Sequence, residues 1–166
     1  MLARVLRHLF APAASRLFPA VVLGRVTSAI RASETNHTGE VCFAVESALP
    51  LPQVWRGADA RIRAREAFAR LGVWDTAANN GVLLYLLLAD HRLEIVADRG
   101  FDGRVSPEQW REVCQVVEDH LRNGDHEAAA VAGIEQLSLI VAAHFPRVAG
   151  VDDLDELPNT PRILGR

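Results

Sequence analysis

An uninterrupted apolar run from Val82 to Ala89 constrains the fold of this chain more than any other segment. Its eight residues are too few to cross a bilayer as a helix. A run of this length is typical of a β-strand buried on both faces. Asp90-His91 supplies a tight turn, after which Leu93–Ala97 returns as a second strand. Because a strand buried on both faces needs helices above and below its sheet, the segment predicts a layered α/β domain.

A further strand and several helices are indicated by the periodicity around this hairpin. Residues 41–46 (VCFAVE) have the pattern of a largely buried strand. Ser106-Pro107-Glu108-Gln109 combines a capping box with proline at the first helical position, which marks the start of a helix. Apolar spacing and end signals predict helices over residues 1–10, 19–32, 52–71, 106–122 and 125–145.

The order of these elements predicts the architecture. Helix, helix, strand, helix, strand, strand, helix, helix gives a three-layer α/β/α sandwich on a small mixed sheet, with N-terminal helices added. Strands 41–46 and 82–89 flank a crossover helix, so as neighbours they run parallel. The third strand pairs antiparallel with the second. We expect N-terminal amphipathic helices over residues 1–32, the α/β/α domain over 33–147 and a disordered acidic tail over 148–166.

Composition removes several function classes. All 18 positive charges are arginine, which excludes a Schiff-base lysine and a Walker-type phosphate loop. The formal net charge of −3 lacks the basic excess that tracks nucleic acid, so we expect no nucleic-acid partner. Cys42 and Cys114 fit no metal motif or disulfide framework, and we expect both to be buried as small apolar residues.

The N-terminal decapeptide MLARVLRHLF is amphipathic and cationic. Leu2, Leu6 and Leu9 follow helical spacing with Val5 and Phe10, while Arg4, Arg7 and His8 lie on the other side. The helix either docks on its own domain or lies on an anionic membrane surface. No clear signal peptide or transmembrane helix is visible, so we expect a cytoplasmic protein, with peripheral membrane attachment as the alternative.

The chain resembles the TPM domain family over residues 33–146. Gly39-Glu40, Trp74, Asn80-Gly81-Val82-Leu83-Leu84 and the segment Ile95–Gly100 match the motif positions of that family. Two departures are clear: Asn79-Asn80 replaces the usual Asp-Asn, and Ala97-Asp98-Arg99-Gly100 replaces a glycine-bearing turn. Many relatives carry a signal peptide and a C-terminal membrane helix, and we expect this chain to represent a short branch without them.

The resemblance and the amphipathic N-terminus together leave three hypotheses for the function. Relatives include a thylakoid-lumen branch linked to photosystem II repair and many bacterial proteins; some are described as acid phosphatases and some bind calcium. The first hypothesis is therefore an accessory module that binds a divalent cation and acts in a membrane-associated protein assembly or maintenance role with an unidentified protein partner. The alternatives are a phosphatase acting on phosphomonoesters and a membrane-surface interaction protein without a metal site.

The predicted topology gathers the residues for these functions at one end of the sheet. Asp75, Asn79, Asp98 and Asp102 offer the carboxylate and amide oxygens that Ca²⁺ or Mg²⁺ prefers. Glu40, Asn80 and Arg99 lie at the same end as further binding residues; the opposite end gathers Glu46, Asp90 and His91.

Each candidate also has another interpretation. Asp75 and Asn79 are as easily explained as turn formers. In a phosphatase, Arg99 would hold phosphate while Asp98 or Asp75 attacks or activates water. We expect the protein not to be a dedicated enzyme; if it is one, we expect a phosphatase.

Overall fold

A four-stranded mixed sheet forms the centre of the structure, a computed structural model that describes residues 1–148 and 155–165. The strand order is β3-β2-β1-β4. β1 pairs in parallel with β2, from Val41 opposite Val82 to Glu46 opposite Leu87, and β3 pairs antiparallel with β2. Parallel pairing of the first two strands and the antiparallel return of the third confirm the topology predicted from the sequence. The strands are β1 (Val41–Glu46), β2 (Val82–Leu87), β3 (Arg92–Ala97) and β4 (Arg162–Leu164).

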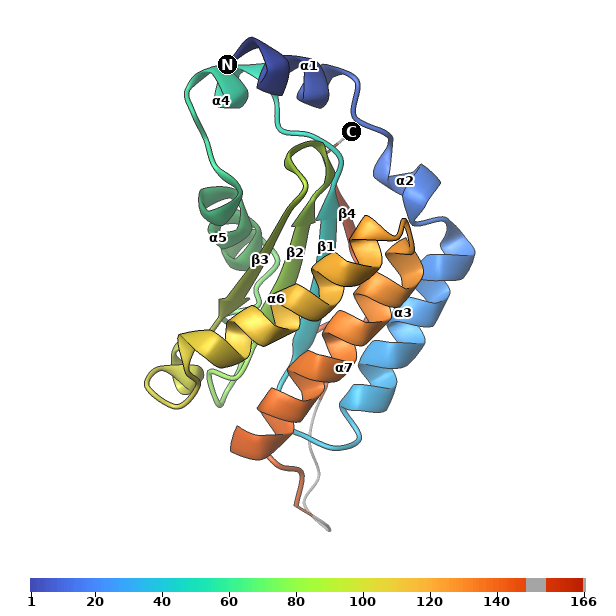
Figure 1. The fold of residues 1–166 in the computed structure, drawn as a ribbon. Helices are drawn as coiled ribbons and strands as arrows, with labels where there is room; N and C mark the ends of the chain where they lie inside the picture. The colour runs from blue at the N-terminus through green and yellow to red at the C-terminus, as the bar shows by residue number, and fades with distance from the viewer. Residues whose placement is uncertain (149–154, 166) are drawn as a thin grey trace.

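Helices cover both faces of the sheet, which confirms the three-layer α/β/α architecture. On one face lie α3 (Ala20–Ser33), α6 (Pro107–Arg122) and α7 (His126–His144), and on the other lies α5 (Ala60–Arg70) (Figure 1). Alternate strand residues feed two separate apolar cores. Phe43 and Leu84 point to the three-helix face, whereas Ala44 and Tyr85 point to the α5 face. All residues of β1 and β2 are buried, as the apolar run predicted.

The predicted helices are present, with one difference. Ser106 and Gln109 form the expected capping box at the start of α6. The single helix predicted over 52–71 is instead two, α4 (Leu51–Trp55) and α5, with the break at Gly57. Gly57 has φ +74°, a left-handed conformation that ends a helix. Asp59 then caps α5 by accepting the N–H of Ile62 at 2.7 Å.

Both ends of the chain are more closely integrated than the sequence suggested. Val26 and Ile30 of α3 belong to the main core, so the packing continues across the boundary placed at residue 32. The tail predicted to be disordered contains β4, which pairs in parallel with β1, and this prediction is wrong for residues 155–165. A strand of three residues is too short to show periodicity, and the free edge of β1 supplies its hydrogen bonds. Residues 149–154 and 166, which complete the predicted tail, lie outside the described residues.

The N-terminal helix α1 (Leu2–Leu9) docks on the domain through Arg4 and His8, together with Val5, which joins the core on the α5 face. Arg4 donates to the Asp90 carboxylate at 2.7 and 3.1 Å, and Arg7 donates to the carbonyl of Ala89. His8 is buried and accepts the N–H of Leu49 at 3.0 Å through Nδ1. The short helix α2 (Ala14–Leu17) follows α1 in the chain. The short helix α4 lies beside α1 at one extreme of the molecule (Figure 1). Among the described residues, no helix is both long and apolar enough to span a bilayer.

Close backbone approaches explain the glycines of the motif segments. A Cβ on Gly81 would collide with the backbone carbonyl of Val73, and one on Gly100 would collide with the carbonyl of Asn79. A Cβ on Gly39 would collide with the side chain of Val141 and lie 3.0 Å from the backbone carbonyl oxygen of Asn80. These three positions bring the loops at the start of β1 and β2 together, so they determine the geometry of that end of the sheet.

We expect Gly81→Ala to lower the free energy of unfolding by about 3 kcal/mol, because the backbone of Val73 cannot move aside as a flexible side chain would. Gly24→Ala is the matched control: nothing lies within 4 Å of the added methyl group, and Gly24 sits inside α3. We expect the control to be neutral or to stabilise by up to about 1 kcal/mol. Urea unfolding of both variants measures the difference, and equal stabilities would contradict the close approach.

Candidate functional site

The sheet end at which β1 and β2 begin holds the residues proposed from the sequence. Asp75 is exposed, Asn79 is half-buried and Asn80 is buried. Asn79 has φ +54° and its carbonyl accepts the N–H of Gly100 at 2.9 Å. Asparagine tolerates this left-handed conformation better than most residues. The departure from Asp-Asn to Asn79-Asn80 therefore places a turn-forming residue at this position.

Asp98 determines the conformation of the second loop, which follows β3. Asp98 caps a short 3₁₀ turn by accepting the N–H of Arg99 at 2.7 Å, and its other carboxylate oxygen is buried without a hydrogen-bond partner among the described residues. Arg99 and Asp102 are exposed. The carboxylates of Asp75, Asp98 and Asp102 are not gathered into a group that could hold one ion together.

A different acidic group converges at this end of the sheet. Within the described part of the chain, one set of three carboxylates has ligand atoms all within 4.8 Å of one another: Glu34, Glu40 and Asp155. We call this set the acidic cluster. Glu34 follows the last residue of α3, Glu40 directly precedes β1, and Asp155 opens the C-terminal segment that leads to β4. Of these, sequence analysis singled out Glu40 as a binding residue but missed its two partners.

Within residues 1–148 and 155–165, no salt bridge joins the acidic cluster to an arginine. Burial, with Glu40 and Asp155 nearby, raises the pKa of Glu34 to about 8. Burial also raises the pKa of Glu40 to about 7, against the lowering effect of the backbone N–H groups of Glu156 and Leu157. Two carboxyl groups with pKa values near neutrality need either a proton or a cation to balance their charge.

Polar atoms around the acidic cluster are incompletely satisfied. Glu34 Oε1 and Asn80 Oδ1 are buried without a hydrogen-bond partner among the described residues. Asn80 itself is 2% exposed, and its backbone carbonyl accepts the N–H of Glu40. Asn159 donates to Asp155 at 3.1 Å while its own Oδ1 is buried and unpaired. Unpaired buried oxygens next to clustered carboxylates are the environment expected of a hard cation.

The C-terminal segment completes the acidic cluster. Glu40 accepts the N–H of Glu156 at 2.8 Å and that of Leu157 at 3.3 Å. The Glu156 carboxylate in turn accepts the N–H of Ala77 at 3.1 Å. These hydrogen bonds to Glu40 hold the segment at the start of β1 and so place the Asp155 carboxylate close to that of Glu34. The sequence offered no signal for that contact beyond the excess of acids in the tail.

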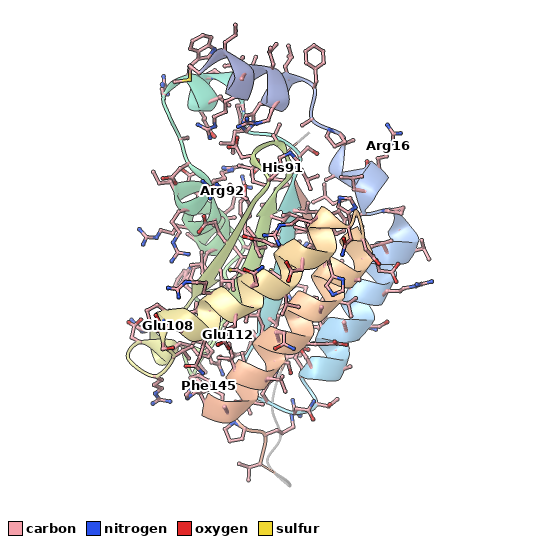
Figure 2. The ribbon with its side chains drawn as sticks, viewed as in Figure 1. Arg16, His91, Arg92, Glu108, Glu112 and Phe145 are labelled. Atoms are coloured by element: carbon pink, nitrogen blue, oxygen red, sulfur yellow. The ribbon has the colours of Figure 1, made fainter. Side chains whose placement is uncertain are left out.

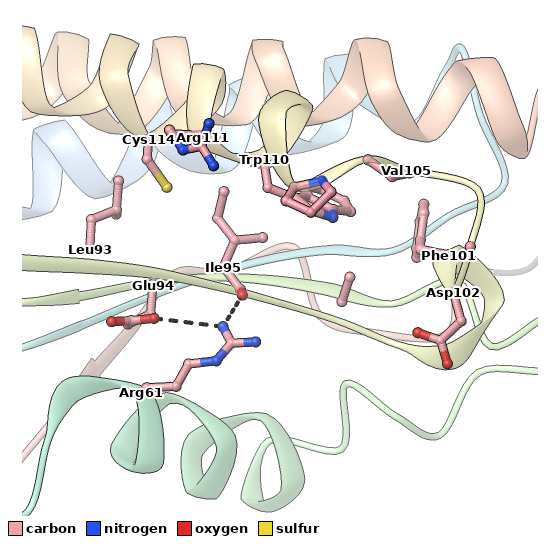
Figure 3. Close-up of a pocket in the computed structure, with 13 residues that line it drawn as sticks. Arg61, Leu93, Glu94, Ile95, Phe101, Asp102, Val105, Trp110, Arg111 and Cys114 are labelled. Carbon is pink, nitrogen blue, oxygen red and sulfur yellow. Dashed lines mark hydrogen bonds and ion pairs between the residues drawn. The ribbon is translucent and has the colours of Figure 1, made fainter.

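A separate pocket of about 490 Å³ lies between β3 and α6 (Figure 3). Arg61 reaches it from α5, donates to the carbonyl of Ile95 and lies 3.6 Å from Glu94. Trp110, Asp102 and Cys114 also line it. Burial raises the pKa of the Cys114 thiol to about 11, so it stays protonated at neutral pH. The pocket residues contain no paired nucleophile and base, which gives this pocket no evident catalytic chemistry.

The opposite end of β1 holds a compensated charge. Glu46 is fully buried and accepts two hydrogen bonds from Arg63, both at 2.8 Å, and one from the Tyr85 hydroxyl at 2.6 Å. Burial and the hydrogen bond to Glu46 raise the pKa of Tyr85. Every oxygen of this carboxylate is paired, so Glu46 acts in structure rather than in ligand binding.

The fold and the site together define a class of protein: a three-layer α/β/α domain that gathers acidic side chains where its parallel strands begin. A family model described as TPM domain matches residues 15–139, which is more than half of the chain. The chain therefore belongs to the TPM domain family.

Two solved structures are similar to the chain, the first in sequence and fold and the second in fold. The chain is similar to the BA42 protein of the psychrophilic bacterium Bizionia argentinensis, with 30% identity over 87% of this chain and 93% of that one and a TM-score of 0.76. It also shares its fold with the N-terminal domain of a P. gingivalis protein, with 18% identity, coverage of 80% and 82% and a TM-score of 0.61. Among curated proteins, none matches the chain.

We expect the free energy of unfolding to fall as pH rises from about 4.5 to about 8 when divalent cations are absent. The folded protein holds protons on Glu34 and Glu40 that the unfolded chain releases near pH 4.5. Their stabilising contribution is therefore complete below the unfolded pKa and is lost through the folded one. Urea unfolding in EDTA should show a decrease of about 1–2 kcal/mol between pH 5.5 and pH 8.5.

Glu34→Gln should reduce this decrease, because the variant has no carboxyl group to titrate at that position. Glu112→Gln, which changes an exposed acid on α6, is the matched control and should leave the decrease intact. A wild-type protein whose stability rises or stays level over this pH range would contradict the electrostatic description of the acidic cluster.

Proposed function

We propose that this TPM domain is an accessory binding module whose ligand is a divalent cation held by the acidic cluster of Glu34, Glu40 and Asp155. The observation that carries the proposal is the convergence of these three carboxylates, from separate parts of the chain, within 4.8 Å of one another. Ca²⁺ binds carboxylate and carbonyl oxygens at 2.3–2.6 Å, so one ion can bridge ligand atoms at that spacing.

The rest of the ligand shell is available nearby. The Asn159 side chain lies against Asp155 and Glu34, its Oδ1 has no hydrogen-bond partner among the described residues, and hard cations accept amide oxygens beside carboxylates. Burial is the main cause of the raised pKa values of Glu34 and Glu40, and repulsion from neighbouring carboxylates adds to it; a bound cation would stabilise the ionised forms against both effects. Ligands carried by a loop and a returning C-terminal segment suit the flexible coordination of Ca²⁺ better than the strict octahedron of Mg²⁺.

The acidic cluster lies at the same end of the sheet as the cation site predicted from the sequence, but it consists of different residues apart from Glu40. The loops before β2 and after β3 contain the four residues predicted as ligands, which form turns or cap the backbone there: Asp75, Asn79, Asp98 and Asp102. Glu40 is shared by both descriptions. A binding role with no chemical step also fits the absence of a nucleophile–base pair among the residues that line the pocket beside α6.

Isothermal titration calorimetry with CaCl₂ at pH 8 tests the proposal. We expect one saturable event with a dissociation constant on the order of 0.1 mM, weak because the site is partly open. Glu34→Gln and Asp155→Asn should each weaken binding at least about tenfold, because each removes a charged ligand. At pH 5.5 binding should be weaker, since protons occupy Glu34 and Glu40.

Asp75→Asn and Asp102→Asn are the matched controls, since each neutralises an exposed carboxylate at the same end of the sheet. Both should bind Ca²⁺ like the wild type. Absence of heat with the wild-type protein at millimolar Ca²⁺, or loss of binding in the controls but not in Glu34→Gln, would refute the acidic cluster as the site.

A further inference from the structure

The apolar side of α1 faces solvent, which is the reverse of how an amphipathic helix usually docks on a domain. Arg4 and His8 point to the domain, and Leu2, Leu6 and Leu9 are exposed on the opposite side of the helix. Phe10, the next residue, is 75% exposed. We call Leu2, Leu6, Leu9, Phe10 and Trp55 the apolar ridge.

Asp90 is what fixes α1 in this orientation. Its carboxylate is 8% exposed and accepts from Arg4, and His8 Nε2 lies 3.1 Å away. Burial alone would raise the pKa of Asp90, but the hydrogen bond from Arg4 and the nearby positive charge lower it to about 2. An anchor of this kind holds the polar side of α1 against the domain throughout the neutral pH range.

Trp55 extends the apolar ridge onto a second element. It is 59% exposed on α4, which packs beside α1 (Figure 1). Tryptophan is enriched where a protein meets the lipid headgroup region, because its ring is apolar and its N–H is polar. The helices α1 and α4, which carry the ridge, lie at one extreme of the molecule (Figure 1).

The surroundings of the apolar ridge are cationic. No aspartate or glutamate occurs before Glu34, and the exposed Arg16 on α2 and Arg56 directly after α4 flank the ridge; Arg7 is instead partly compensated by Asp90, 3.4 Å away. Figure 2 shows Arg16 projecting outward from α2, and His91 at the tip of the β2–β3 hairpin on the same side of the molecule. A second copy of the chain would bring the same positive charges together and is disfavoured for that reason.

We propose that the apolar ridge is a docking surface for an anionic lipid bilayer. Exposed leucines, phenylalanine and tryptophan would enter the headgroup boundary, and the surrounding arginines would lie against anionic headgroups. One short helix buries little apolar area, so attachment is reversible and weakens as salt concentration rises. Because α1 is already folded and oriented by Asp90, binding needs no refolding of this helix.

Vesicle co-sedimentation of the full chain in EDTA tests the inference. EDTA removes Ca²⁺, so the result is independent of the cation site. Vesicles of mixed phosphatidylcholine and phosphatidylserine should bind the wild type, and phosphatidylcholine vesicles should not. The double variant Leu6→Glu/Phe10→Glu should lose at least about tenfold in partitioning. Leu139→Glu, which alters a leucine 65% exposed on α7, is the matched control and should bind like the wild type.

Tryptophan emission gives a second readout. The wild type should shift to shorter wavelength on anionic vesicles, Trp55→Phe should abolish the shift, and Trp74→Phe should retain it. Trp74 is 53% exposed in the loop before β2, at the other end of the sheet. The proposal is overturned if the wild type does not bind anionic vesicles, or if Leu6→Glu/Phe10→Glu binds unchanged. It is also overturned if the ridge instead mediates a concentration-dependent dimer that the double variant abolishes in light scattering.

Discussion

Two buried carboxylates at the ends of β1 organise the whole molecule. Glu40 directly precedes the strand and Glu46 ends it, and both are less than 5% exposed. Burying a charge is costly unless it is paired, so each carboxylate recruits other parts of the chain. Arg63 neutralises Glu46 and so ties α5 to the sheet, and the Tyr85 hydroxyl donates a further hydrogen bond to the same carboxylate. Glu40 receives backbone N–H groups from the C-terminal segment but no arginine, so its charge stays uncompensated.

This asymmetry divides the protein into two different ends. Where the parallel strands begin, Glu34, Glu40 and Asp155 converge, and burial raises the pKa values of Glu34 and Glu40 toward and above neutrality. Where they finish, Asp90 attracts the positive side of α1 and leaves its apolar side in solvent. The end where β1 and β2 begin therefore gathers carboxylates that pair with no arginine among the described residues, and the end where they finish exposes apolar side chains of α1. The rigid three-layer core between them keeps the two surfaces apart, so a cation and a lipid surface could be bound independently.

The sequence predicted the parts of this structure that depend on local patterns. Continuous apolar strands, the capping box at Ser106 and the parallel crossover all follow from spacing and residue type, and they gave the sheet topology and the placement of Glu40 and Asp90 at opposite ends. The acidic cluster could not be predicted in the same way, because Glu34 and Asp155 meet through a contact between residues far apart in the sequence. That contact depends on β4, whose three residues carry no periodic signal. The inverted docking of α1 was equally hidden, since amphipathic spacing reveals two faces but not which one the domain binds.

A Ca²⁺ titration followed by two-dimensional NMR of backbone amides tests the central claim most directly, because it locates the ion as well as detecting it. The account predicts saturable shifts concentrated at Glu34, Glu40, Asn80 and residues 155–157, with the amides of α1 and of the exposed Asp75 and Asp102 little changed. Shifts centred on Asp75, Asp98 and Asp102, with none at Glu34 or Glu40, would contradict it and return the cation site to the loops beside β2 and β3.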